Sequence, residues 1–177
     1  MNGIHPLRDR VFRPWKNGGG DTAEIVVSPP GAGFDDFEWR ISTALVASDG
    51  PFSRFPGVDR VLTVIEGGPM ALTIDGHVRQ LDEHSSPLAF PGDAPCEARL
   101  CGPPLLDFNL MLRRPLAAQV RKGPLRPAGG RALARLALLL EDRAGLSRLD
   151  LVDLDAAAPR LAAALTGVQA ISVEIGG

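Results

Sequence analysis

Residues 13–25 read Arg-Pro-Trp-Lys-Asn-Gly-Gly-Gly-Asp-Thr-Ala-Glu-Ile, with a triple glycine directly before a β-prone run. Consecutive glycines adopt positive φ readily and leave backbone N–H groups open to close approach. The glycines therefore form either a flexible turn before a strand or a loop that holds backbone and polar side chains against a small ligand. No Gly-Lys-Ser/Thr follows and no apolar helix begins there, which excludes a phosphate-binding loop of the nucleotide-binding kind.

The composition around this segment favours a small all-β protein. The 177 residues include 20 glycines and 16 prolines, which divide the chain into short segments. The length predicts one domain or two small barrel halves packed as one unit. The net charge of -2 and the absence of a basic-aromatic stripe exclude nucleic acid as the main partner. With no apolar run near the ~20 residues of a membrane span and no signal peptide, we expect no membrane association, reduced cysteines and a cytoplasmic protein.

Two predicted strands, at residues 36–46 and 105–112, carry polar side chains opposite an apolar row. Strict alternation of this kind is typical of β-strands. The polar faces either meet water or line a polar cavity inside a barrel. The side chains on these polar faces are Glu38, Arg40, Ser42, Asp107 and Asn109, with Met111 beside them.

Shorter strands are expected at residues 22–27, 60–66 and 88–90. The best local signal is a hairpin, in which Asp75-Gly76 separates the runs 70–74 and 77–81.

The C-terminal third is harder to interpret. Residues 121–130 are rich in proline and glycine and predict a linker or long loop. Residues 131–144 fit a helix by their leucine and alanine spacing and a buried strand by their alternation. A faint repeat favours the strand, because Arg-Val-Leu-Thr-Val-Ile-Glu at 60–66 resembles Arg-Leu-Ala-Leu-Leu-Leu-Glu at 135–141. Further strands at 149–155, 160–166 and 170–175 would complete a second β unit.

The sequence predicts neither a metal site nor a catalytic group. Its three histidines, His5, His77 and His84, have no histidine or cysteine at metal-ligand spacing. There is no Gly-x-Ser-x-Gly motif, and neither Cys96 nor Cys101 lies beside a plausible base. What remains is a set of amides, carboxylates and an arginine near the glycine run and on strand faces. Such a set suits a small organic acid, because the planar fork of arginine binds both oxygens of a carboxylate.

Several motifs together resemble the HutD/Ves family, in the family's order, over about residues 13–114. They are Pro-Trp-Lys-Asn-Gly-Gly-Gly at 14–20 with Thr22, Glu24 and Ile25; Trp-Arg-Ile-Ser at 39–42; Asp-Gly-Pro-Phe-Ser at 49–53; Phe-Pro-Gly at 55–57 with Asp59-Arg60; Phe-Pro-Gly-Asp at 90–93; and Asp-Phe-Asn-Leu-Met-Leu-Arg-Arg at 107–114.

The resemblance implies a cupin-like double-stranded β-helix, or jelly-roll barrel, with two β units in one chain (a bicupin). The first unit, residues 1–120, would carry the motifs, and residues 121–177 would form the rest of a smaller second unit. Metal-binding cupins place two histidines and a glutamate in the slot that corresponds to residues 53–60, and this chain has no histidine there. We therefore expect that the cupin metal site is lost and that there is no cofactor.

The resemblance also implies a link to histidine utilisation. We expect a non-enzymatic protein that modulates this pathway by binding a small carboxylate such as urocanate or formylglutamate. Arg40 would pair with the carboxylate, and replacing it with alanine should abolish binding without unfolding the protein. The other expected ligand-binding residues are Asn17, Ser42 and Asn109 as hydrogen-bond partners, Trp15 or Phe52 as an apolar wall, and Gly19, Glu24 and Asp107.

Three other interpretations remain open at this stage. One is a metal-independent cupin-like enzyme acting on a similar acid, with Glu24 or Asp107 as base. Another is an interaction protein whose anchors are Trp15, Trp39 and Phe52. In the third, Arg40 and Asp107 pair with each other for structure alone. An exposed sheet edge or apolar barrel face would also suit a homodimer.

Overall fold

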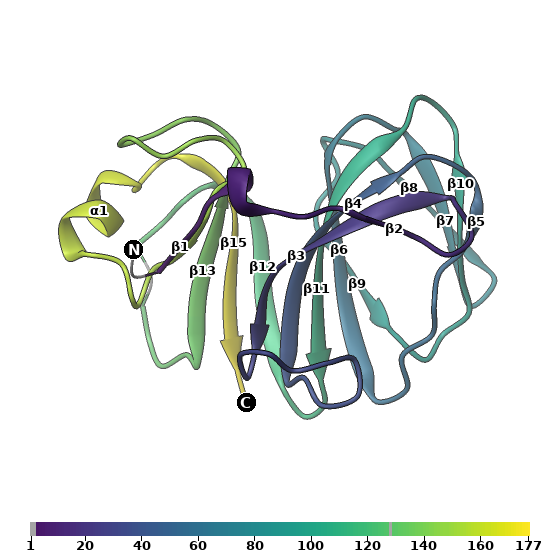
Figure 1. Cartoon of the computed structure of the whole chain (residues 1–177), viewed down its shortest axis with the longest axis horizontal. Coiled ribbons are helices and arrows are strands. Elements are labelled where there is room, and N and C mark those ends of the chain that lie inside the picture. Colours follow the sequence, from purple (N-terminus) through teal and green to yellow (C-terminus); the bar gives the residue numbers. More distant parts are fainter. Residues whose placement is uncertain (1–2, 128) are drawn as a thin grey trace. The chain divides into compact units, whose positions relative to one another are not determined.

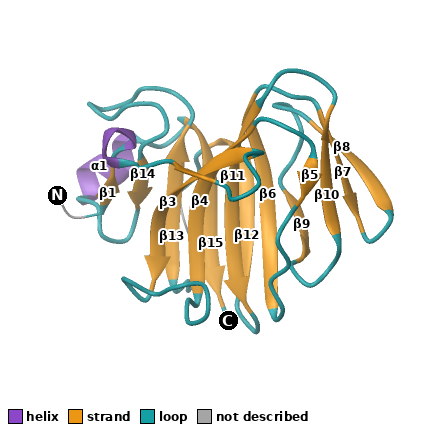
Figure 2. Ribbon diagram, turned by 45° about the vertical axis from the view of Figure 1, so that its right-hand side comes forward, coloured by secondary structure: helices purple, strands orange, loops and turns teal. Residues whose placement is uncertain are grey.

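The computed structural model describes residues 3–127 and 129–177, and strands dominate its regular structure (Figures 1 and 2). The predicted all-β class is confirmed. The chain forms two compact units, which we call the central unit (Val11–Arg114) and the terminal unit (residues 3–10 with Pro115–Gly177). No helix among the described residues has the length and apolar character needed to cross a bilayer.

Two antiparallel sheets build the central unit. The six-stranded sheet has the order β2 (Arg13–Pro14), β3 (Gly20–Ser28), β4 (Trp39–Val46), β11 (Leu105–Arg113), β6 (Val58–Glu66) and β9 (Leu88–Pro91). The four-stranded sheet has the order β5 (Gly50–Pro51), β10 (Cys96–Leu100), β7 (Met70–Ile74) and β8 (His77–Leu81). Buried side chains of both sheets, among them Leu62, Leu72 and Leu105, form one core cluster. The hairpin and the strands predicted within this unit are present, and Asp75 and Gly76 both have positive φ at the hairpin turn.

The register of β11 aligns polar residues from three strands. Residues that face each other across antiparallel strands project to the same side of the sheet. The three successive rows across β4, β11 and β6 are Arg40–Met111–Arg60, Ser42–Asn109–Leu62 and Ala44–Asp107–Val64. The polar residues predicted from alternation in β4 and β11 therefore lie on one face. The apolar residues Ile41, Phe108 and Leu110 on the other face are fully buried as well.

The terminal unit contains one five-stranded antiparallel sheet. Its order is β1 (Ile4–His5), β14 (Leu151–Asp153), β13 (Ala134–Leu139), β15 (Gln169–Gly176) and β12 (Ala117–Pro124). The short 3-10 helix η1 (Leu7–Asp9) follows β1, and the helix α1 (Pro159–Ala164) precedes β15. Its own core cluster includes Ala137, Leu139, Val152 and Leu165.

The structure corrects two expectations for this unit. Residues 160–166, expected as a strand, belong mostly to α1, which begins at Pro159. Proline at the first helical position and a run of alanine and leucine both favour the helix. Part of the expected linker at 121–130 is strand β12, which pairs residue by residue with β15. The ambiguous 131–144 segment contains strand β13, because pairing with β14 on one side and β15 on the other outweighs its helix propensity.

The compact units also differ from the expected ranges 1–120 and 121–177. Strand β12 lies within the terminal unit, and β1 pairs with β14 there, so residues at both ends of the chain share one sheet (Figure 2). A two-residue strand such as β1 carries too little periodicity to be found from sequence.

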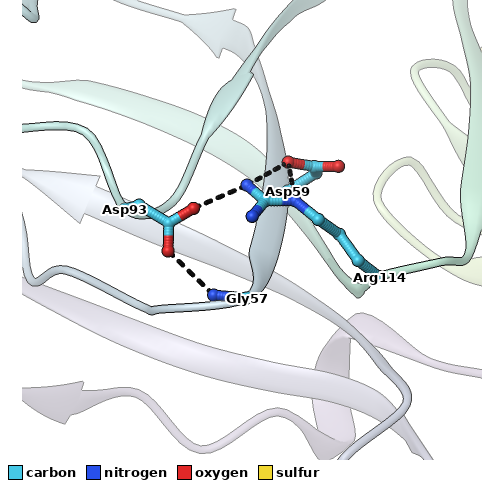
Figure 3. A network of polar contacts seen from close by, with 4 residues as sticks. All are labelled: Gly57, Asp59, Asp93 and Arg114. Atoms are coloured by element: carbon cyan, nitrogen blue, oxygen red, sulfur yellow. Dashed lines mark hydrogen bonds and ion pairs between the residues drawn. The ribbon is translucent and has the colours of Figure 1, made fainter.

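A salt-bridge network joins the ends of neighbouring strands in the six-stranded sheet (Figure 3). Both Nε and Nη2 of Arg114 donate to Oδ1 of Asp59, at 3.0 and 2.8 Å, and Nη2 also lies 2.6 Å from Oδ2 of Asp93. The other oxygen of Asp93 accepts a hydrogen bond from the backbone N–H of Gly57 at 2.8 Å. The network therefore ties together the ends of β6 and β11 and the turn after β9, so these motif residues have a structural role.

We predict that Gly20→Ala destabilises the central unit. A Cβ at residue 20 would collide with the carbonyl oxygen of Leu45 and lie 3.2 Å from the Trp15 ring. Overpacking of this kind costs about 1–3 kcal/mol. Urea denaturation should show the loss, whereas Gly129→Ala, where a Cβ would meet no atom within 4 Å, should leave the midpoint almost unchanged. Equal midpoints for Gly20→Ala and wild type would contradict the close approach.

We predict that Asp93→Asn lowers stability at neutral pH but not in acid. Hydrogen bonds from Arg114 and from the backbone of Gly57 lower the pKa of the Asp93 carboxyl. A carboxyl whose folded pKa is depressed stabilises the fold above its unfolded pKa, and this contribution disappears as the pH falls through the folded pKa. Urea midpoints of the two proteins should therefore converge below about pH 4. A difference in urea midpoint between the two proteins that stays constant with pH would indicate that the ionised carboxylate is not the stabilising form.

Candidate functional site

Arg60 is a buried cation on the polar face of the six-stranded sheet. Only 8% of the residue is exposed. Its Nη2 donates to Oδ1 of Asn109 at 3.3 Å, and its Nη1 donates to the carbonyl oxygen of Ser53 at 3.4 Å. The guanidinium carbon lies 5.3 to 5.7 Å from the centroids of three phenyl rings, which belong to Phe52, Phe55 and Phe90.

Among the described residues, no carboxylate forms an ion pair with Arg60, whereas Arg40 of the same unit has one such partner and Arg114 has two. The Nε atom of Arg60 is buried without a hydrogen-bond partner. The phenyl rings stabilise the cation but do not neutralise it. Burial lowers the pKa of Arg60, and attraction to Cys96 and Asp107 opposes this shift. An uncompensated buried charge is costly, so this position favours the arrival of an anion.

Asn109 connects Arg60 to a buried carboxyl group. Its Nδ2 donates to Oδ1 of Asp107 at 2.5 Å, while its Oδ1 accepts from Arg60. Asp107 has no exposed surface, and its Oδ2 has no hydrogen-bond partner. Burial raises the pKa of Asp107 to about 7, against the opposing effects of Arg60 and the Asn109 hydrogen bond. The amide therefore links a permanent cation to a group that titrates near neutral pH.

Arg40 is already neutralised. Its Nη2 lies 3.1 Å from Oε2 of Glu24, and its guanidinium carbon lies 4.1 Å from the centroid of the Phe34 ring. Phe34 in turn stacks on Phe55, with centroids 5.7 Å apart. Burial lowers the pKa of Arg40, and Glu24 opposes this shift. An incoming carboxylate would therefore have to compete with Glu24 for Arg40.

The triple-glycine loop is held by bonds within the chain. The N–H of Gly19 donates to Oδ1 of Asn17 at 3.0 Å, and the carbonyl oxygen of Gly19 accepts from Ala47 and Ser48. Trp15 donates from Nε1 to Oγ1 of Thr22 at 2.6 Å. These bonds give Asn17 and Gly19 a structural role in the turn.

The structure brings most of the expected site residues together. Glu24, Arg40, Ser42, Asp107 and Asn109 share one face of the sheet through their register. Phe52 reaches the same region through its contact with Arg60, and Trp15 meets the Phe52 ring edge to face at 6.3 Å.

Sequence reasoning missed Arg60 as a site residue. The run 60–66 predicts a strand, but this prediction does not say which of its residues point to which side of the sheet. Alternation places Arg60 on the same face as Leu62 and Val64, both buried. The signal in the sequence was a charged residue that alternation places on the same strand face as buried apolar residues.

No metal-binding cluster is found in the part of the chain that the structure describes, where no three residues among His, Cys, Asp and Glu are grouped suitably. Cys96 is buried, Cys101 is exposed, and both are free thiols, as expected from the sequence.

The HutD family model matches residues 8–149. The chain belongs to the HutD family. Among curated relatives, the Ves protein of Cronobacter sakazakii is 41% identical over 128 residues, which is 71% of this chain and 69% of that protein. A 21.2 kDa protein in the hutC 3′ region of Pseudomonas putida, described as uncharacterized, is 41% identical over 63% of this chain and 59% of its own length. The chain thus spans less than two thirds of some of these relatives.

Solved structures match this HutD-family chain over its whole length. HutD from Pseudomonas fluorescens, recorded in a formate condition, gives a TM-score of 0.80 at 31% identity and covers 99% of this chain and 98% of that one. YlbA of Escherichia coli gives a TM-score of 0.61 over 98% of this chain and 85% of that one, but it is 11% identical and shows the fold alone. The expectation of an all-β fold is confirmed.

We predict that stability falls as the pH rises from about 4 to 7 because of Asp107. Its folded pKa, raised to about 7, lies above the unfolded value, so the folded state binds more protons in this interval. The free energy of unfolding then decreases by at most about 1.4 kcal/mol per pH unit. Asp107→Asn should remove this slope in urea denaturation. Parallel stability profiles for the two proteins would show that Asp107 is not protonated when buried.

Proposed function

We propose that the central unit binds a small carboxylate, with Arg60 as its anchor. The observation that carries this proposal is the buried Arg60 guanidinium, which has amide, carbonyl and aromatic neighbours but no ion pair with a described carboxylate. The guanidinium fork presents paired N–H donors to a carboxylate, and charge-assisted bonds of this kind are the strong ones.

The neighbouring residues supply orientation and shape. Asn109 and Ser42, adjacent on the sheet face, would donate hydrogen bonds to the ligand. Phe52, with Trp15 behind it, would form an apolar wall. Arg40 remains a candidate contact, but its pairing with Glu24 places it second to Arg60.

Membership of the HutD family implies a link to histidine utilisation. We propose a modulator that recognises a pathway acid such as urocanate or formylglutamate without converting it. The two compact units would be the two halves of a bicupin, in which the central unit with its two sheets is the jelly-roll barrel and the terminal unit with its single sheet is the smaller half. This assignment is supported by the separate cores of the units and by the similar runs in β6 and β13, both of which lie between two neighbouring strands.

We predict that Arg60→Gln weakens carboxylate binding. Calorimetric titration of chelator-treated protein with formate, urocanate and formylglutamate should show saturable binding of at least one acid. Losing a charge-assisted hydrogen-bond pair should weaken binding by about tenfold or more. Arg40→Gln should have a smaller effect, because Glu24 already occupies that guanidinium.

The controls separate binding from folding. Arg114→Gln removes the same charge from the same unit at an exposed position outside the polar face, so it should retain binding once its own stability loss is taken into account. Urea denaturation identifies any variant that fails to fold, and Arg60→Lys, which keeps the charge but loses the fork, provides a milder test. Unchanged affinity in a folded Arg60→Gln protein, or no binding of any of the three acids by wild type, would reject the proposal.

The raised pKa of Asp107, about 7, favours one second candidate function. A carboxylate that titrates near the working pH is suited to act as a general base. In this alternative the central unit is a metal-independent enzyme on a similar acid. Product formed by purified, chelator-treated protein and lost in Asp107→Asn would establish it, whereas binding without turnover supports the modulator.

A further inference from the structure

A pocket in the terminal unit lies at one end of the five-stranded sheet. Its volume is about 250 Å³, and it lies against β12, β13, β15 and the segment that follows β12. The register places Gln119, Glu174 and Arg135 in one row, and Arg121, Ser172 and Ala137 in the next row of the same face. Ala137 belongs to the apolar core of this unit. Arg121, Arg135, Ser172 and Glu174 of the pocket lining therefore lie on the sheet face that also carries Ala137.

Positive charge predominates around this pocket. Among the described residues, four basic ones line it, namely Arg121, Lys122, Arg126 and Arg135, together with one acidic residue, Glu174. A concave site lined mainly by one sign of charge focuses the potential and attracts ions of the opposite sign.

Arg135 is the fixed member of this group. Its Nη1 lies 2.8 Å from Oδ1 of Asp155, its Nη2 donates to the carbonyl oxygen of Gly130, and its Nε is buried without a partner. Arg121 is held differently, because its Nη2 donates to Oε1 of Gln119 at 2.9 Å. This amide orients the guanidinium without neutralising it, so Arg121 keeps its full charge beside the pocket.

We propose that this pocket binds a small dianion, such as a phosphate monoester or a short dicarboxylate. The four basic residues less Glu174 and Asp155, the partner of Arg135, leave an excess of two positive charges (4 − 2), which favours a doubly charged ligand over a singly charged one. Ligand pockets commonly measure about 300–1,000 Å³, so a pocket of this size selects a small molecule. The proposal does not depend on the Arg60 site, since every residue in it belongs to the terminal unit.

The test is calorimetric titration of the full chain with inorganic phosphate and with succinate, which distinguishes the two kinds of dianion. Wild type should bind at least one of them saturably. Arg121→Gln should weaken that binding by about tenfold or more, because one charge-assisted contact is lost. Glu174→Gln should tighten binding severalfold, a gain that a purely structural role would not produce.

Arg131→Gln is the matched control. Arg131 is exposed, lies in the same segment of the chain and does not line the pocket, so its loss changes the net charge equally and should leave the affinity unchanged. Equal weakening by Arg121→Gln and Arg131→Gln would overturn the proposal in favour of diffuse surface charge. No saturable binding of either dianion, or tighter binding by Arg121→Gln, would also overturn it.

Two further measurements separate this site from the Arg60 site. Dianion binding should persist in Arg60→Gln, and backbone amide NMR shifts on titration of wild type should centre on β12 and β15. Binding that disappears in a folded Arg60→Gln protein, with shifts centred on β6 and β11, would assign the ligand to the central unit and reject the second site.

Discussion

The pairing of β11 with both β4 and β6 is the constraint on which the central unit depends. A shift of one residue in this register would turn Asp107 and Asn109 to the opposite face of the sheet. With the observed register, Asn109 contacts Arg60 on one side and Asp107 on the other. The contacts of Asn109 with Arg60 and Asp107 therefore depend on strand alignment. Any substitution that loosens this alignment would disturb these contacts even if it lies elsewhere in the sheet.

Asp59 and Arg60 are neighbours on β6, and their charges are stabilised in different ways. Asp59 is partly exposed and pairs with Arg114, which also contacts Asp93 (Figure 3). Arg60, the next residue, is buried and contacts phenyl rings and an amide, and no carboxylate in the described part of the chain pairs with it. Exposed ion pairs of this kind contribute little energy because water screens them, whereas a buried charge is costly until it is paired. The first arrangement fixes the turn after β9, and the second leaves a position that a ligand can complete.

Much of this fold could be predicted from local patterns, and the site could be predicted in part. Alternation identified β4 and β11, and the Asp75-Gly76 signal identified the hairpin, because both are properties of neighbouring residues. Strand β12 was missed because pairing with the distant β15 decides it. The helix α1 was missed although Pro159 and the alanine-leucine run that favour it are local signals. The sheet face of Arg60 could be predicted from its strand. That no carboxylate of the described residues pairs with Arg60 depends on residues far along the chain.

The pairing of β1 with β14 gives the chain an unusual order of assembly. During synthesis from the N-terminal side, Ile4 and His5 are made before the central unit, whereas their partners Val152 and Leu151 are made after it. The strands of the central unit all lie within Val11–Arg114, so this unit can fold before the sheet of the terminal unit is complete. A cut or an attached domain next to Ile4 would therefore disturb the sheet of the terminal unit, although the central unit is nearer in sequence.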